Sequence, residues 1–156
     1  MFFKKVFQAL EAEGVRYAVA GGVAVALYGA TRGTVDIDLV LAFNEKNFER
    51  AEKALKSLGL QPRLPVTAKD VFRFREEYLK NRNLMAWSFI NLNNPTEMVD
   101  LLLAHDLKSM KTKTISFQGL KIKLVSLKDL IQMKTGTGRC QDEEDIKSLQ
   151  YKRGQP

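Results

Sequence analysis

Three aspartates lie in apolar stretches of the chain, where a carboxylate needs a compensating partner. Asp36 and Asp38 occur within the run VDIDLVLAF, and Asp100 occurs within EMVDLLLA. Burying a carboxylate is costly unless the group is ion-paired, hydrogen-bonded or bound to a metal ion. These three residues are therefore the first candidates for chemistry.

The spacing of the first two aspartates is that of a strand with one polar face. Successive strand side chains point to opposite faces, so Asp36 and Asp38 should share one face and Val35, Ile37 and Leu39 the other. Two adjacent carboxylates repel unless a cation lies between them or one is protonated. Mg²⁺ takes oxygen ligands and often uses one or two carboxylates plus substrate phosphates. The pattern indicates either a divalent-cation site or an exposed strand face with two solvated aspartates.

The glycines upstream favour the cation site. Gly21 and Gly22 follow the apolar run 15–20 and precede a short apolar segment, 23–28, that reads as a helix. Backbone N–H groups at such a strand-to-helix turn favour a phosphate. Glycine pairs also form tight turns for steric reasons alone. The glycine pair indicates a phosphate site more specifically when it is combined with Arg32 and with the D-x-D pair that follows.

The remaining elements must position these residues, and their order predicts the fold class. Helices are predicted over 2–13, 23–28, from the cap Asn44 to Gly59, and over 69–81, 127–134 and 141–151. Strands are predicted over 15–20, 35–43, 84–92, 97–104, 114–117 and 120–124, with a loop or irregular edge at 61–67. This order predicts a single α+β domain, α/β-like and spanning 1–156, with a central mixed β-sheet flanked by helices.

Composition fits a globular protein of the cytoplasm. The 156 residues are 45% hydrophobic and 28% charged, and Cys140 is the single cysteine, as expected in a reducing compartment. The start lacks the apolar core of a signal peptide, and no run approaches the roughly 18 residues of a membrane span. We therefore expect no membrane association. The net charge of +7 makes an anionic partner plausible without identifying it.

The motifs together resemble a known superfamily. The pattern resembles the signature of the polymerase-beta-like nucleotidyltransferases, in particular the small bacterial branch with abortive-infection toxin nucleotidyltransferases and aminoglycoside- and lincosamide-nucleotidylating enzymes. The residues that carry it are Gly21, Gly22, Gly29, Arg32, Thr34, Asp36 and Asp38, then Asp100, and then Lys134, Arg139, Asp142 and Asp145. The resemblance is thin between 60 and 95, and many members have serine where this chain has Gly22.

The resemblance implies a function and a role for each residue. It implies Mg²⁺- or Mn²⁺-dependent transfer of a nucleoside monophosphate from a nucleoside triphosphate such as ATP to an acceptor hydroxyl, with release of pyrophosphate. Asp36, Asp38 and Asp100 would be the catalytic, metal-binding carboxylates. Nucleotide-binding residues would be Gly21, Gly22, Arg32, Lys134 and Arg139. The alternative is a non-catalytic nucleotide-binding or antitoxin-like relative that acts in a larger complex.

Other features permit less specific interpretations. His105, the only histidine, is more typical of a surface or hydrogen-bonded residue than of a ligand. Trp87, Phe89 and Tyr78 are expected to pack in the core or to line a groove, with stacking on a nucleobase as the alternative. Asp142 and Asp145 fit a capped helix with a salt bridge. The basic segment 108–128 is either a solvated hairpin face or an RNA-binding surface. The acceptor therefore stays open among RNA, protein and small molecules, and a partner protein or homodimer could help to bind it.

Overall fold

The computed structural model describes residues 1–154 and has seven α-helices and seven strands in that range. The helices are α1 (Phe2–Ala12), α2 (Gly21–Leu27), α3 (Glu45–Ser57), α4 (Ala68–Arg73), α5 (Arg75–Asn81), α6 (Leu127–Lys134) and α7 (Cys140–Arg153), with a 3-10 helix at Leu107–Ser109. The strands are β1 (Tyr17–Ala20), β2 (Ile37–Leu41), β3 (Gln61–Pro62), β4 (Ala86–Asn91), β5 (Asn94–Leu102), β6 (Thr112–Phe117) and β7 (Leu120–Val125). The predicted domain 1–156 includes residues 155 and 156, which lie outside the described residues.

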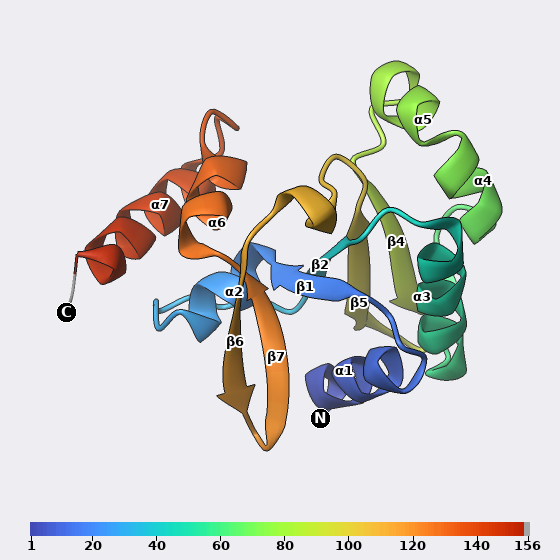
Figure 1. Ribbon diagram of the computed structural model, residues 1–156, viewed down its shortest axis with the longest axis horizontal. Helices are drawn as coiled ribbons and strands as arrows, with labels where there is room; N and C mark the ends of the chain where they lie inside the picture. The colour runs from blue at the N-terminus through green and yellow to red at the C-terminus, as the bar shows by residue number, and fades with distance from the viewer. Residues whose placement is uncertain (155–156) are drawn as a thin grey trace.

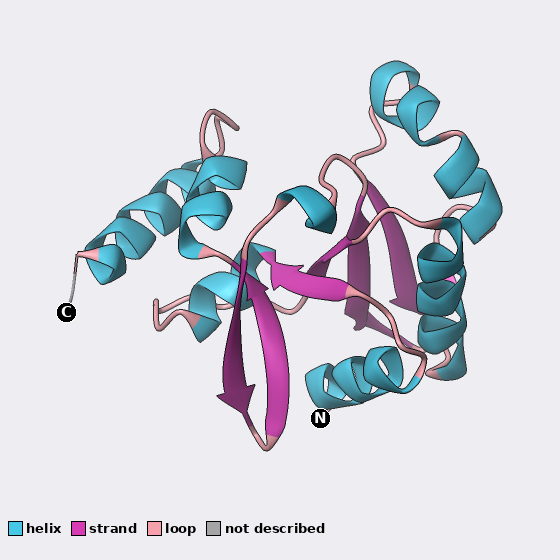
Figure 2. Ribbon diagram, viewed as in Figure 1, coloured by secondary structure: helices cyan, strands magenta, loops and turns pink. Residues whose placement is uncertain are grey.

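The strands form one mixed sheet, so the predicted α+β fold class is confirmed. Its order is β3-β4-β5-β2-β1-β7-β6, and β2 pairs parallel with β5 while β1 pairs antiparallel with β2. Figure 1 shows α6 and α7 at one side of the molecule and α3, α4 and α5 at the other, with the sheet between them. Figure 2 shows the same arrangement by element type. Among residues 1–154, no helix is both long and apolar enough to cross a bilayer.

Two neighbouring rows of side chains show that the sheet carries an apolar row on one face and a more polar row on the other. Trp87, Leu101, Leu39 and Val19 occupy matching positions on four adjacent strands, and all are fully buried. The next position on each strand faces the other way. There the matching residues are Ser88, Asp100, Asp38 and Ala20. The apolar row stabilises the fold, and the polar row is available for function.

Strand β2 is shorter than predicted. It begins at Ile37, so Asp36 lies in the preceding loop, and Val35, predicted to face the core, is 57% exposed. The reason is the absence of a partner strand at this point: the register with β1 ends at Asp38 and that with β5 begins at Ile37. Without a ladder to pair with, the chain before Ile37 has no reason to stay extended in the sheet.

The predicted helix 69–81 is two helices that meet at Phe74. Phe74 leaves helical geometry, with φ −105° and ψ 19°. The next residue, Arg75, lies over the ring of Phe43 with its guanidinium carbon 3.6 Å from the ring centroid, and its Nε donates to the Leu103 carbonyl at 2.6 Å. This contact with the end of β5 breaks a helix that the sequence pattern alone would continue. The predicted loop 61–67 also contains strand β3.

Candidate active site

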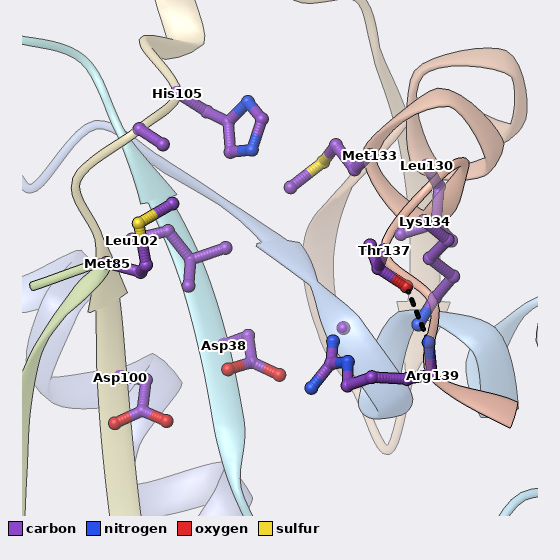
Figure 3. A pocket seen from close by; sticks show the side chains of 12 residues that line it. Asp38, Met85, Asp100, Leu102, His105, Leu130, Met133, Lys134, Thr137 and Arg139 are labelled. Carbon is purple, nitrogen blue, oxygen red and sulfur yellow. Dashed lines mark hydrogen bonds between the residues drawn. The ribbon is translucent and has the colours of Figure 1, made fainter. Parts of the chain in front are cut away.

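Asp38 and Asp100 lie side by side on the polar face of the sheet. They are register partners on the parallel strands β2 and β5, so both carboxylates project to the same side (Figure 3). Ser88 on β4 is the next residue of this row, and its hydroxyl donates to Asp100 Oδ1 at 2.5 Å. The row thus joins two carboxylates, one of which is held in orientation by a neighbouring hydroxyl.

Burial and neighbouring carboxylates raise the pKa of both Asp38 and Asp100. Burial, together with the nearby charges of Asp100 and Asp36, raises the pKa of Asp38 to about 6. Burial also raises the pKa of Asp100, and the charge of Asp36 adds to the effect while the Ser88 hydrogen bond opposes it. Asp36, Asp38 and Asp100 therefore create one region of negative potential. A cation in that region would relieve the repulsion.

Gly21 brings the turn between β1 and α2 against this pair. Its φ is +61°, and a Cβ at this position would stand 1.8 Å from Asp38 Oδ2. A side chain at residue 21 would therefore overlap the carboxylate. At Gly22 a Cβ would stand 3.0 Å from the Thr34 side chain and 3.3 Å from a guanidinium nitrogen of Arg32. Gly21 therefore lets the backbone approach Asp38 closely, and Gly22 lets it approach the loop that carries Arg32 and Thr34.

A cleft of about 450 Å³ separates the carboxylates from a basic wall formed by α6 and α7. It is lined by Gly21, Asp38, Met85, Asp100, Leu102, Ala104, His105, Leu130, Met133, Lys134, Thr137 and Arg139. Figure 3 shows the guanidinium of Arg139 pointing toward Asp38 across this cleft. An anion in the cleft would meet two cationic side chains on one wall, and a cation would meet two carboxylates on the other.

The basic wall is built on a buried ion network. Lys134 is only 7% exposed, and its ammonium donates to Asp142 at 3.1 Å and to Asp145 at 3.0 Å. Arg139 Nε donates to Asp142 at 2.8 Å, and Arg32 Nε lies 3.2 Å from a carboxylate oxygen of Asp145. The salt bridges predicted for the two aspartates are therefore present. They attach α7 to α6 and to the loop that carries Arg32.

The hydrogen bonds of this network hold Asp142 ionised. Burial alone would raise the pKa of Asp142, but hydrogen bonds from Thr137, Lys134 and Arg139 keep that pKa below its usual range. Lys134 faces both the network and the cleft. The ion pairs of Lys134 with the two carboxylates hold the cleft wall together, and its positive charge contributes to the electrostatic potential of the cleft.

The structure brings five of the eight predicted site residues to the cleft lining: Gly21, Asp38, Asp100, Lys134 and Arg139. Asp36 and Arg32 lie in the loop before β2, and Gly22 lies in the first turn of α2. Among residues 1–154, no three carboxylate, imidazole or thiol groups gather closely enough to form a metal-binding cluster. The carboxylate oxygens that act on Asp38 are nevertheless the donor type that Mg²⁺ and Mn²⁺ take.

Several functional features were missed in the sequence. Ser88 alternates with the buried Trp87 and Phe89, which pack in the core as predicted, and this alternation could have placed Ser88 on the polar face. His105 lines the cleft, and burial and the charge of Arg75 lower its pKa. Leu130 and Met133 also line the cleft, and they could not be identified from the sequence because their position depends on how α6 packs against the sheet.

Solved structures with the same fold are nucleotidyltransferases. The antibiotic-resistance factor ANT(2'')-Ia superimposes with a TM-score of 0.66 at 13% identity, over 98% of this chain and 83% of that chain. The lincosamide antibiotic adenylyltransferase LnuA, bound to lincomycin, gives 0.63 at 16% identity over 94% and 95%. An antigenic nucleotidyltransferase-like protein from Paracoccidioides brasiliensis gives 0.58 at 18% identity over 95% and 74%. No curated protein sequence matches the chain significantly.

The family comparison covers nearly the whole chain and confirms the predicted resemblance. Residues 3–152 match the family described as nucleotidyltransferase of unknown function (DUF6036). The match includes the glycine turn, the three aspartates and the ion network. It supports the predicted general activity, transfer of a nucleotidyl group. The chain belongs to this nucleotidyltransferase family.

Proposed function

We propose that the protein transfers a nucleoside monophosphate from a nucleoside triphosphate to an acceptor hydroxyl, with release of pyrophosphate and in the presence of Mg²⁺ or Mn²⁺. One observation carries the proposal: the carboxylates of Asp38 and Asp100 lie in register beside the Gly21 turn and face a basic wall. Such a cleft offers separate sites for a divalent cation and for the phosphates that accompany it.

Three groups of this chain would hold the triphosphate. The backbone of Gly21 lies beside Asp38, and the N–H groups of Gly21 and Gly22 would donate to phosphate oxygens. Arg139 already faces Asp38, and Lys134 lies on the same wall. Their positive charges would neutralise the leaving pyrophosphate. Arg32, held by Asp145, would act mainly by fixing the loop before β2.

Asp100 is the residue proposed to accept the proton of the attacking hydroxyl. Its Oδ1 is held by Ser88, and its pKa is raised by burial, which suits a base that must take up a proton. The acceptor oxygen forms a bond to the α-phosphorus as the bond from that phosphorus to the bridging oxygen breaks. The proton passes to Asp100, and the electron pair leaves with pyrophosphate.

The metal ion would bind on the carboxylate side of the cleft. Asp36, Asp38 and Asp100 would hold it, and when bound it would supply Lewis-acid stabilisation of charge at the reacting phosphate. The apolar part of the cleft, from Leu102 to Met133, would receive the nucleobase or sugar. We also propose that the protein acts in the cytoplasm, because its single cysteine, Cys140, suits a reducing compartment.

The test is incubation of the protein with each α-³²P-labelled nucleoside triphosphate, Mg²⁺ or Mn²⁺, and total RNA or a protein extract. Label should appear on one acceptor class and should be absent with the Asp36→Asn, Asp38→Asn double variant. If the wild-type protein binds nucleoside triphosphate but transfers no label to any acceptor, the non-catalytic alternative replaces this proposal. If it binds no nucleoside triphosphate with either metal, both interpretations fail.

A further inference from the structure

The polar row on the sheet does not end at Ser88. The backbone N–H of Arg63 donates to the Ser88 carbonyl at 2.9 Å, one position beyond the paired residues Pro62 and Phe89 of β3 and β4. Opposite residues of an antiparallel pair share a face. Arg63 therefore continues the row that runs through Ser88 and Asp100 to Asp38. Its positive charge opposes the rise in the pKa of Asp100, which agrees with this placement.

Arg63 has no partner that would explain its position. Its side chain is exposed, and within residues 1–154 no carboxylate forms an ion pair with it. The row places it two strands from Asp100, roughly 10 Å across the sheet, on the side away from the basic wall that faces the triphosphate. An arginine at this distance from the proposed base is placed to contact the acceptor and not the triphosphate.

The surface beside Arg63 continues as a groove. One part, of about 320 Å³, is lined by Arg63, Leu64, Leu84, Ala86 and Ser88. A second part, of about 460 Å³, is lined by Leu64, Pro65, Val66, Tyr78, Arg82 and Leu84. The two parts share Leu64 and Leu84 and so form one surface, which we call the edge groove. It has an arginine in each part and apolar side chains between them.

The charge of the edge groove restricts the acceptor. None of its lining residues is acidic, so a polycationic acceptor would find no counter-charge there. Arginine binds phosphate bidentately. Arginines that follow a backbone, combined with an aromatic and apolar surface for bases, are the features that bind single-stranded nucleic acid. Tyr78, Leu64 and Leu84 supply that surface between the two arginines.

We propose that the edge groove binds the 3′ end of a single-stranded nucleic acid, with a phosphate on Arg63 and the terminal hydroxyl at Asp100. This rests on the proposed function and specifies its acceptor. Arg82 would contact a phosphate further from the end, and a base would lie on Tyr78. The terminal hydroxyl would then be the nucleophile that attacks the nucleoside triphosphate.

The experiment uses the full chain and fluorescein-labelled single-stranded RNA and DNA homopolymers of ~10 nucleotides. Binding is measured by fluorescence anisotropy over a series of salt concentrations. Arg63→Gln should weaken binding about tenfold. It should also reduce the slope of log affinity against log salt by about 0.7, the value for one lost phosphate contact on a single strand. The matched control is Arg50→Gln, at an exposed arginine of α3 outside the groove, which should leave both quantities unchanged.

A second measurement separates this inference from the proposed function. Binding of ATP with Mg²⁺ should be the same in Arg63→Gln and in the wild-type protein, because the arginine lies away from the triphosphate wall. If ATP binds but no homopolymer does, or if Arg63→Gln and Arg50→Gln weaken the homopolymer equally, the edge groove is not the acceptor site. Label transferred to a protein or to an uncharged small molecule, with none on nucleic acid, would also overturn it. Failure of ATP binding in the wild-type protein would instead overturn the proposed function.

Discussion

The backbone of Gly21 occupies space directly against the carboxylate of Asp38. A Cβ on residue 21 would lie 1.8 Å from Asp38 Oδ2 and 2.6 Å from its Cγ. The start of α2 and the beginning of β2 are therefore fitted to each other. The contact is possible because glycine tolerates the φ of +61° found there.

The first prediction is that Gly21→Ala destabilises the protein and removes nucleotide binding. The left-handed conformation alone costs an alanine roughly 1–2 kcal/mol, and the overlap with Asp38 adds to this. Thermal melting and ATP titration with Mg²⁺ measure the two effects. Gly33→Ala is the control, because Gly33 has open space around it and no positive φ. Equal melting temperatures and equal ATP affinities in the two variants would contradict the close fit.

The second prediction concerns the pH dependence of stability without metal. In the folded protein the pKa of Asp38 is raised from 3.8 to about 6. Between these two pH values the folded protein keeps a proton on Asp38 that the unfolded chain has released. This contribution to stability is present below pH ~4 and is lost as pH rises through ~6. Asp38→Asn cannot ionise, so at pH 7 its free energy of unfolding should exceed that of the wild-type protein, by on the order of 2 kcal/mol.

Urea unfolding of both proteins between pH 4 and pH 8 in a chelating buffer measures this difference. The two free energies should converge near pH 4 and separate toward neutral pH. Glu77→Gln, at an exposed residue of α5, is the control and should follow the wild-type curve throughout. A wild-type protein that is more stable than Asp38→Asn at pH 7 would show that Asp38 has a stabilising partner and not a repulsive neighbourhood.

Asp38 and Asp100 could be identified from the sequence as candidate site residues, but the contact between them could not be predicted. A carboxylate within an apolar run is a local signal, so Asp38 and Asp100 were identifiable as residues that need compensation. Their contact depends on parallel pairing of β2 with β5 in one register. Alternation within a strand predicts which residues share a face but does not predict which strand lies beside it. The resemblance to a family supplied that relationship.

The same limit explains what was missed at the sheet edge. Arg63 lies in a segment with two prolines that reads as a loop, and its place beside Ser88 depends on the short strand β3. The end of α4 at Phe74 depends on a contact of Arg75 with Phe43 and Leu103, which are distant in the sequence. Long-range packing overrides local preference in both cases.

The third prediction tests the buried ion network. Lys134→Met removes the ammonium that binds Asp142 and Asp145 and leaves two buried acids with reduced compensation. Removing one partner of a buried ion pair costs ~3–5 kcal/mol. The partial compensation that Arg32 and Arg139 still give places the expected loss near ~3 kcal/mol, or ~6–12 °C in melting temperature. Lys128→Met, at an exposed lysine of the same helix, should change the melting temperature little. Similar melting temperatures for both variants would show that the network is not structural.

The last prediction concerns Asp100, whose proposed role is in the reaction and not in binding the nucleoside triphosphate. Asp100→Asn keeps the shape of the side chain and can still accept the Ser88 hydrogen bond, so the fold should be unchanged. Nucleoside triphosphate affinity should fall little, because the phosphates are expected to lie on Gly21, Gly22 and the basic wall. The variant cannot take the proton of the attacking hydroxyl, and losing a general base typically lowers rate by ~10²–10⁴-fold. The loss should therefore appear in kcat with KM nearly unchanged, since the interaction is made only in the transition state. Glu97→Gln on the same strand, where Glu97 accepts a hydrogen bond from Asn91, is the matched control and should retain full rate. Full transfer activity in Asp100→Asn would remove Asp100 from the proposed mechanism while leaving the nucleotide-binding cleft in place.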